Sequence, residues 1–241
     1  MTQGARGTFI TLEGVDGAGK STQAARLVER LRARGLEVVA LREPGGTAIS
    51  EKVRALLLDP ANAEMANECE LLLYEASRAQ LVRQVIEPAL GRGAVVVCDR
   101  YFDSTYAYQA GARGLGDDLV RQANRLGSCG VRPDLTLVLD MEPERALSRA
   151  AAEGADRLEA EGVAFQRRVR EAYLRLASEE PARVRLVDAD GSADEVASRI
   201  DAEVSSVVSA CGNGLCAEGE ACVLGTGPAE AAPACEGGAS R

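Results

Sequence analysis

A glycine-rich segment near the start of the chain has the residue types and the spacing to hold phosphate. It matches the pattern G-x-x-x-x-G-K-S from Gly14 to Ser21. In such a loop, glycines let successive backbone N–H groups point at a phosphate, and the next helix N-terminus adds its dipole. Lys20 would bridge phosphate oxygens, and the Ser21 hydroxyl would ligate Mg²⁺. The residues expected to bind the phosphates of a nucleotide are Gly14, Val15, Asp16, Gly17, Ala18, Gly19, Lys20, Ser21 and Thr22.

The segments around this loop indicate the elements that position it. A β-branched run at 8–13 predicts a strand before the loop, and apolar residues at helical spacing predict a helix at 21–34 after it. Further strands are predicted at 38–41, 94–98, 135–139 and 184–187, and further helices at 47–58, 67–90, 117–128, 143–152, 161–179 and 192–209. This alternation predicts an α/β fold, a three-layer P-loop NTPase sandwich with a five-stranded parallel sheet in one domain at 1–209.

The predicted topology also places the site. In doubly wound sheets, ligands bind at the carboxyl ends of the strands. We therefore expect Gly14, Arg42, Asp99 and Asp140, each of which follows a strand, to lie along one edge.

Composition and charge exclude several classes of function. The chain has no histidine, which excludes histidine triads and His-ligated metals. A net charge of −9 argues against a broad nucleic-acid surface, so we expect no nucleic acid among its partners. No apolar run is long enough for a membrane span or a secretion signal, so we expect no membrane partner and a cytoplasmic location.

The phosphate loop alone leaves open a kinase, a GTPase switch or a motor ATPase. A switch GTPase would need an N-K-x-D motif, and none of the four asparagines is followed by lysine. Three further segments narrow the choice: Arg42 to Thr47 (REPGGT), Leu71 to Gln80 (LLLYEASRAQ) and Asp99 to Gln109 (DRYFDSTYAYQ). Together they resemble bacterial thymidylate kinase, a nucleoside monophosphate kinase, from about Phe9 to Ile200. The resemblance implies transfer of the ATP γ-phosphoryl group to dTMP, with Mg²⁺ as cofactor and a homodimeric assembly.

The resemblance implies roles for the acceptor-phosphate side of the site. Arg100 would hold the acceptor phosphate, since a guanidinium fork can grip two oxygens; the alternative is an ordinary ion pair with Asp99 or Glu43. Asp99 would help to place Mg²⁺ together with Ser21, or else cap a helix. Asp16 and Glu43 would form an acidic corner near the sugar and metal, unless they are solvated loop acids.

The resemblance also implies how the base would be bound. Tyr74, where the family usually has phenylalanine, would stack on it, and Arg78, four residues later on the same helix face, would donate to a thymine carbonyl. Thr105 and Gln109 would meet the other polar edge, and Tyr108 would crowd the 2′ position of the sugar. Alternatively, Tyr74 and Tyr108 are core aromatics. Arg54 and Ser104 complete the expected acceptor site.

The segment at 149–160 resembles the family lid. Positions 15–18 of the phosphate loop contain no arginine. As in the bacterial subtype, the positive charge that stabilises the transferring phosphoryl group would therefore come from the lid, here from Arg149 or Arg157. A solvated basic turn is the alternative. The remaining functional alternatives are a kinase of another nucleoside monophosphate and a nucleotide-binding regulator without turnover.

The composition changes near residue 210. Four of the seven cysteines lie in a Gly-rich tail at 210–241, at Cys211, Cys216, Cys222 and Cys235. Their spacing resembles cysteine-rich repeats of bacterial surface proteins, but lacks a cysteine near 225. A disordered appendage, a metal site and disulfide pairing or partner binding all stay open for this tail. The other three cysteines, Cys69, Cys98 and Cys129, are expected to be buried as small hydrophobes.

Overall fold

The computed structural model describes residues 6–150 and 161–208. Arg157, the rest of the expected lid at 151–160 and the cysteine-rich tail at 210–241 lie outside the described residues, so the predictions made for them stay predictions. The strands are β1 (Phe9–Glu13), β2 (Val38–Arg42), β3 (Val95–Asp99), β4 (Leu135–Asp140) and β5 (Val184–Asp188). The helical elements are α1 (Lys20–Ala33), α2 (Ala48–Leu58), η1 (Pro60–Asn62), α3 (Asn67–Leu81), η2 (Val82–Ile86), α4 (Glu87–Gly91), α5 (Phe102–Thr105), η3 (Tyr106–Ala112), α6 (Asp117–Gly127), α7 (Pro143–Ala150), α8 (Val163–Glu179) and α9 (Ala193–Val204).

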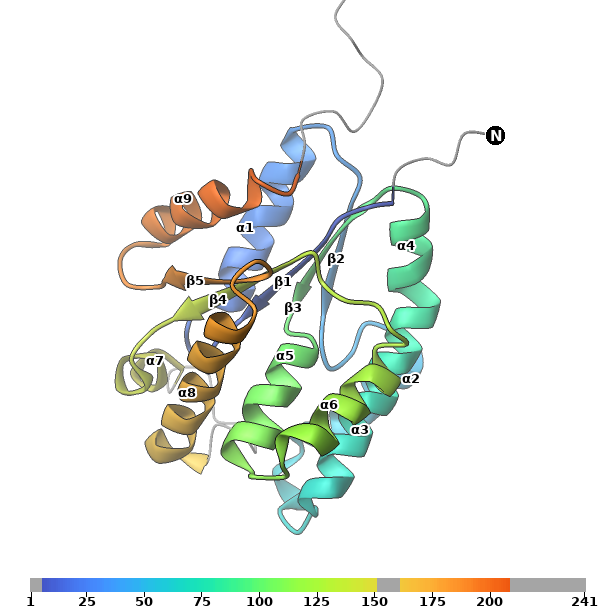
Figure 1. Ribbon diagram of the computed structural model, residues 1–241, viewed down its shortest axis with the longest axis vertical. Helices are drawn as coiled ribbons and strands as arrows, with labels where there is room; N and C mark the ends of the chain where they lie inside the picture. Colours follow the sequence, from blue (N-terminus) through green and yellow to red (C-terminus); the bar gives the residue numbers. More distant parts are fainter. Residues whose placement is uncertain (1–5, 151–160, 209–241) are drawn as a thin grey trace, which may run out of the picture.

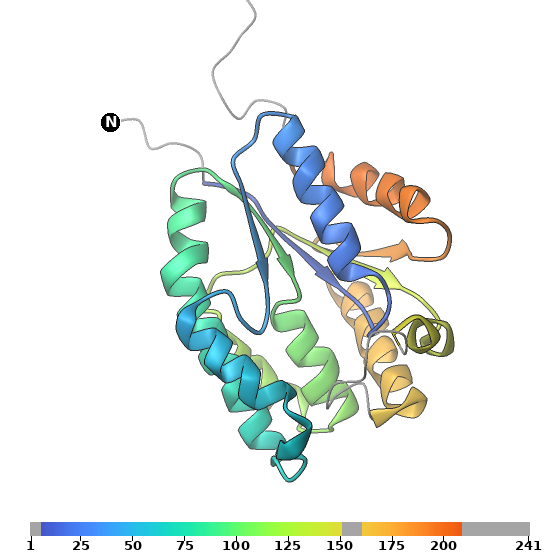
Figure 2. The same ribbon diagram turned by 180° about the vertical axis from the view of Figure 1, so that it is seen from behind.

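The described strands form one five-stranded sheet in the order β2-β3-β1-β4-β5, and every pairing is parallel. Strand β1 lies at the centre and all five of its residues are buried, as expected for a strand covered on both faces. Helix α1 crosses the face seen in Figure 2, while α5 and α8 lie on the face seen in Figure 1. The structure therefore confirms the predicted three-layer α/β fold.

The strand register confirms that the residues at the ends of the strands lie along one edge of the sheet. Asp99, the last residue of β3, is level with Arg42 of β2 and with Leu12 of β1, and Glu13 of β1 is level with Val138 of β4. The loops that follow these strands therefore leave from one edge of the sheet. Asp140 also ends a strand there, but Nε of Arg170 on α8 lies 2.7 Å from its carboxylate. Asp140 is thus engaged in a pair between β4 and α8.

Two helical segments lie outside the predicted helices: the single turn η1 at 60–62 and a longer segment at 102–112. Residues 102–112, within the acceptor motif, form α5 and the π-helical segment η3. A π-turn carries more residues per turn than an α-helix, so apolar residues in this segment do not recur at α-helical spacing. The predicted strands and helices are all present, with ends shifted by a few residues. The largest shift is in α9, which ends at Val204 rather than 209.

The prediction for the cysteines holds only in part. Cys98, next to the last residue of β3, is buried as expected. Cys69 is exposed, which contradicts the expectation, because it lies on the outward side of the first turn of α3. Cys129 is half-buried in the turn after α6.

A buried ion pair fastens α5 to the sheet. The Arg183 guanidinium donates to both carboxylate oxygens of Asp103, at 2.6 and 2.9 Å, and to Oγ1 of Thr136, at 2.8 Å. Asp103 is only 1% exposed, so its charge depends on this partner. The pair joins the start of the acceptor segment to β4 and to the turn before β5.

Replacing Arg183 should therefore be costly. We expect Arg183→Met to lower the free energy of unfolding by about 3–5 kcal/mol, because the Asp103 carboxylate would stay buried without its partner. Arg132→Met is the matched control, since Arg132 forms an exposed pair with Glu180 and should contribute under about 1 kcal/mol. Urea unfolding measures both. Equal effects of the two variants would contradict this account.

Candidate active site

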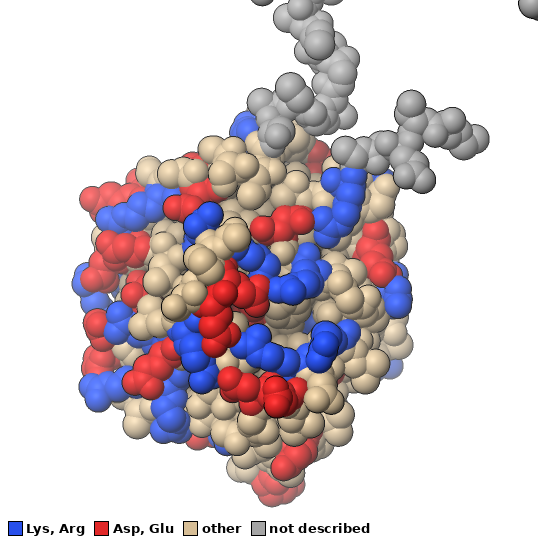
Figure 3. Space-filling model, in the orientation of Figure 1, with Lys and Arg blue, Asp and Glu red and all other residues tan. Residues whose placement is uncertain are grey.

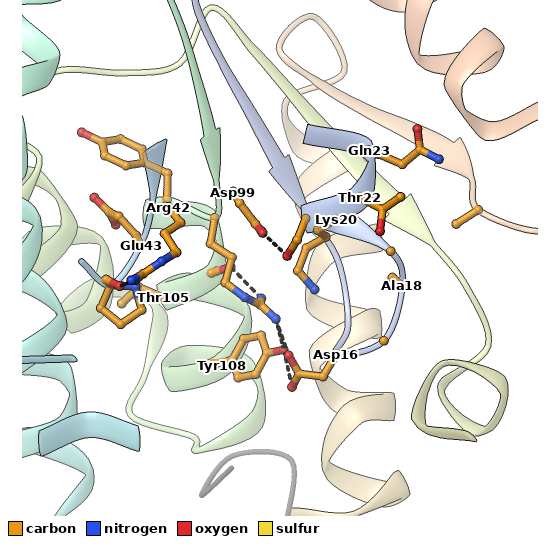
Figure 4. A pocket seen from close by; sticks show the side chains of 18 of the residues that line it. Asp16, Ala18, Lys20, Thr22, Gln23, Arg42, Glu43, Asp99, Thr105 and Tyr108 are labelled. Carbon is orange, nitrogen blue, oxygen red and sulfur yellow. Dashed lines mark hydrogen bonds and ion pairs between the residues drawn. The ribbon is translucent and has the colours of Figure 1, made fainter. Parts of the chain in front are cut away.

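The residues that the sequence singled out converge on one pocket at the carboxyl edge of the sheet. It is lined by the phosphate loop, the ends of β2 and β3, and residues of α3, α5 and η3. Figure 4 shows Lys20 and Asp16 on one side of this pocket and Glu43 and Thr105 on the other. The expected site residues that line it are Asp16, Gly17, Ala18, Gly19, Lys20, Ser21, Thr22, Glu43, Arg54, Tyr74, Arg78, Asp99, Arg100, Ser104, Thr105, Tyr108, Gln109 and Arg149.

The phosphate loop is held in a conformation that only glycine permits. Gly17 has φ +81°, and a Cβ at this position would lie 2.0 Å from the carbonyl oxygen of Ala146 on α7. Lys20 begins α1, and its Nζ donates to the carbonyl oxygen of Val15 at 2.8 Å. Burial, and then the nearby Arg100 charge, lower the pKa of Lys20 to about 8. An arriving phosphate would add the negative charge that restores a higher pKa.

A hydroxyl and a carboxylate meet beside this lysine. The Ser21 hydroxyl donates to Oδ2 of Asp99 at 2.5 Å, as drawn in Figure 4. The other oxygen, Oδ1 of Asp99, is buried and has no hydrogen-bond partner within the described part of the chain. Oxygen donors of this kind, completed by water and phosphate oxygens, suit Mg²⁺. The residues present therefore fit the expected metal.

Asp16 and Arg100 form the ion pair at the centre of the pocket. The Arg100 guanidinium contacts the Asp16 carboxylate and donates to the Tyr108 hydroxyl at 3.1 Å, while that hydroxyl donates to Asp16 at 2.9 Å. Gln166 of α8 donates its amide to the same carboxylate at 2.7 Å. Burial opposes ionisation of Asp16, but the charges of Arg100 and Lys20 outweigh it and lower its pKa. Arg100 thus pairs with Asp16, and not with Asp99 or Glu43 as the alternative proposed.

Glu13 lies behind Arg100 and fixes its surroundings. Its carboxylate is fully buried and accepts from the Tyr101 backbone N–H at 2.8 Å, the Ser104 hydroxyl at 2.5 Å and the Tyr173 hydroxyl at 3.0 Å. Arg100 in turn donates to the Ser104 oxygen at 3.1 Å. Because the Ser104 hydrogen points to Glu13, Ser104 supports Arg100 as well as lining the pocket. Arg100 itself has φ +70°, a left-handed backbone conformation that these contacts hold in place.

A second buried arginine lies at the other end of the pocket. Arg78 is 1% exposed and donates from Nε to Glu43 at 2.8 Å and from Nη2 to Thr105 at 2.8 Å. Its Nη1 donates to Glu75 at 2.7 Å and to Asn124 at 3.2 Å. Burial, only partly offset by Arg78, raises the pKa of Glu43 to about 7. Glu43 therefore belongs to the Arg78 cluster, whereas the sequence suggested an acidic corner shared with Asp16.

Several of these positioning residues escaped the sequence interpretation. Glu13 could have been noticed, since it is the one charged residue in an apolar strand and directly precedes the phosphate loop. Gln166 and Tyr173 come from α8, about 150 residues from the loop that they support, and no local pattern marks them. Their contribution depends on the packing of α8 against η3.

Comparison with known proteins decides the family. The thymidylate kinase family model matches residues 12–200. The chain belongs to the thymidylate kinase family. It is 53% identical over 206 residues to the thymidylate kinase of Pseudomonas putida (strain GB-1), covering 85% of this chain and 98% of that relative. It is 51% identical over 207 residues to that of Desulfosudis oleivorans, covering 83% and 97%.

A solved structure of the family agrees. The crystal structure of thymidylate kinase from Ehrlichia chaffeensis superimposes with a TM-score of 0.66 at 31% identity, covering 83% of this chain and 99% of that one. The chain is thus a nucleoside monophosphate kinase, a phosphotransferase, as its motifs predicted. No helix in the described part of the chain is long and apolar enough to cross a membrane. Acidic and basic side chains intermingle over the face drawn in Figure 3.

The buried Glu13 carboxylate predicts a pH dependence of stability. Burial, and then the Asp103 charge, raise its pKa from 4.5 to about 8, so the folded chain keeps this proton where the unfolded chain has lost it. The contribution of protonated Glu13 to the free energy of unfolding is therefore complete below pH about 4.5, and it is lost as the pH rises through about 8. Relative to Glu13→Gln, we expect the free energy of unfolding of the wild type to fall by up to about 1.4 kcal/mol per pH unit in this window.

Urea unfolding at pH about 5, 6.5 and 8 measures this difference. If the free energy of unfolding of the wild type and that of the Glu13→Gln variant differ by the same amount at all three pH values, the predicted role of Glu13 is contradicted.

Proposed function

We propose that this chain transfers the γ-phosphoryl group of ATP to dTMP and so forms dTDP. The observation that supports it best is the pocket itself, which joins a phosphate loop to a second subsite with its own buried arginines. One end presents Lys20 and backbone N–H groups for the donor phosphates. The other end presents Tyr74 and Arg78 for a base, and Arg100 lies between the two ends. A single-nucleotide switch would need only the first end.

Arg100 would hold the acceptor phosphate. Its side chain is already fixed by Asp16, Tyr108 and Ser104, so binding requires little ordering of a flexible side chain. The acceptor phosphate needs no strong general base, because phosphoryl transfer passes through a loose transition state. Positioning and charge neutralisation by Lys20 and Arg100 therefore provide the main rate enhancement.

Ser21 and Asp99 would hold Mg²⁺. The Ser21 hydroxyl oxygen and Oδ1 of Asp99, which has no hydrogen-bond partner among the described residues, would supply oxygen donors, directly or through water. A metal held by these two residues would supply positive charge to the donor phosphates as phosphoryl transfer proceeds.

The acceptor base would lie between Tyr74 and Arg78. The four hydrogen bonds of Arg78 within the protein use four of its five N–H groups. The remaining one, on Nη2, can donate to a base carbonyl. The Tyr108 ring, fixed through its hydroxyl, would crowd the 2′ position of the sugar and favour deoxyribose, and Arg54 would complete the acceptor site from α2.

We also propose a homodimer. Neighbouring helices α2, α3 and α6 expose large apolar side chains, among them Leu56, Leu72 and Leu126, which is 79% exposed. Such a concentration on one set of helices suits a subunit interface. Sedimentation equilibrium should give a dimer that Leu72→Glu with Leu126→Glu converts to a monomer. The control, Leu186→Glu on β5, should leave it intact.

A panel of monophosphates tests the substrate. In a coupled assay of ADP release, we expect dTMP to give the highest kcat/KM among dTMP, dCMP, dAMP and dGMP. If another monophosphate is phosphorylated and dTMP is not, the assignment of dTMP as the acceptor is wrong. Absence of turnover with all four monophosphates would contradict the proposed reaction.

Arg149 and Arg157 would supply charge to the transferring phosphoryl group. Arg149, at the end of α7, is exposed and lines the pocket, while the role of Arg157 rests on the sequence. We expect Arg149→Ala with Arg157→Ala to lower kcat by about 10³-fold, the scale of an arginine that acts in the transition state, with dTMP affinity little changed. Stopped-flow kinetics and calorimetry separate the two quantities. An equal loss of dTMP binding would contradict the assignment.

A further inference from the structure

The first turn of α3 carries a buried carboxylate that neither the phosphates nor the base would touch. Glu70 is fully buried, and it precedes Tyr74 and Arg78 at intervals of four residues, so all three lie on one face of α3. Tyr74 and Arg78 line the pocket, whereas Glu70 does not. Glu70 therefore lies behind the acceptor subsite.

Glu70 contacts Gln109 of η3, a residue that lines the subsite. The Gln109 amide Nε2 donates to Oε1 of Glu70 at 2.8 Å. The Arg113 guanidinium forms an ion pair with the same carboxylate at 3.3 Å. An ionised carboxylate only accepts hydrogen bonds, so the amide must turn its nitrogen toward Glu70.

This contact determines what Gln109 offers to a ligand. With Nε2 held by Glu70, the amide presents its carbonyl oxygen, Oε1, as an acceptor. No hydrogen bond from the residues described in the structure reaches this oxygen, and Gln109 lines the pocket. Flipping the Gln109 amide would place its Oε1 against the Glu70 carboxylate. Two buried acceptors would then face each other without a hydrogen between them, which is strongly unfavourable.

A donor lies next to this acceptor. Nη2 of Arg78 donates to Thr105, which is one helical turn before Gln109, and keeps one further N–H. The edge of the subsite therefore offers an acceptor beside a donor. A pyrimidine with an N–H next to a carbonyl, as in thymine and uracil, complements this order; cytosine, with a bare ring nitrogen next to an amino group, opposes it at both places.

We propose that Glu70 is a specificity-determining positioning residue, which selects thymine over cytosine by fixing the orientation of the Gln109 amide. This inference rests on the proposed function. A residue that only stabilises α3 would change kcat/KM for all acceptors by the same factor. Replacement of Glu70 should instead change kcat/KM for the cytosine and thymine acceptors by different factors.

The test is the ratio of kcat/KM for dTMP to that for dCMP in the full chain. In Glu70→Gln the neighbouring amide can rotate, Gln109 can flip, and its nitrogen can donate to cytosine. We expect the ratio to fall at least about tenfold, with part of the preference kept by Arg78, while the ratio of dTMP to dUMP stays constant. The matched control is Glu161→Gln, because Nη1 of Arg113 donates to Glu161 at 2.5 Å but Glu161 has no contact with Gln109 in the described structure.

A swap provides the second variant. In E70Q/Q109E the amide and the carboxylate exchange places, so position 109 again presents an acceptor and the preference for dTMP should return. This double variant retains the buried pair, and it keeps the proposal testable if Glu70→Gln unfolds, which thermal melting shows.

The outcomes separate the two levels of inference. If the wild type does not phosphorylate dTMP, the proposed function itself fails. If it does, a folded Glu70→Gln variant with an unchanged ratio overturns the role of Glu70, as does an equal change in Glu161→Gln. If Glu70→Gln does not fold, a swap variant without the dTMP preference overturns it.

Discussion

The ion pair between Asp16 and Arg100 is the contact on which the site depends. Asp16 belongs to the phosphate loop and Arg100 follows β3, so this pair joins the donor side of the pocket to the acceptor side. Both side chains are largely buried, and an unpaired charge at this depth would be strongly destabilising. The order β3-β1-β4 makes the contact possible, because β1 and β3 are neighbours whose ends are level. The parallel sheet thus sets where the two substrates can meet.

The same principle recurs along the pocket. Two arginines that face the acceptor subsite are held from behind by carboxylates: Arg100 by Asp16, and Arg78 by Glu43 and Glu75. Such a site is ordered before its ligands arrive, so less binding energy is lost in fixing side chains. It also explains an acidic chain that binds polyanionic nucleotides: positive charge is concentrated inside one pocket and surrounded by carboxylates.

The sequence predicted the fold and most of the pocket because both depend on local patterns. Buried strands, the glycine-rich loop and the residues that follow each strand are visible without tertiary information, and Lys20 and Asp99 were found in this way, whereas Arg100 was found through the family resemblance. The missing parts depend on packing between distant segments. Gln166 and Tyr173 reach the site only through α8, the π-helical η3 has no α-helical period, and the pairing of Glu43 with Arg78 requires the relative position of β2 and α3.

The central claim is that Asp16 acts on catalysis by holding Arg100, and a double-mutant cycle tests it most directly. The variants are Asp16→Asn, Arg100→Met and their combination, and the measured quantity is kcat/KM for dTMP. If the pair acts as a unit, Asp16→Asn should lower kcat/KM by about tenfold or more in the wild type and have little effect once Arg100 is replaced. The same loss from Asp16→Asn in both backgrounds would show that the two residues act independently and would contradict the account.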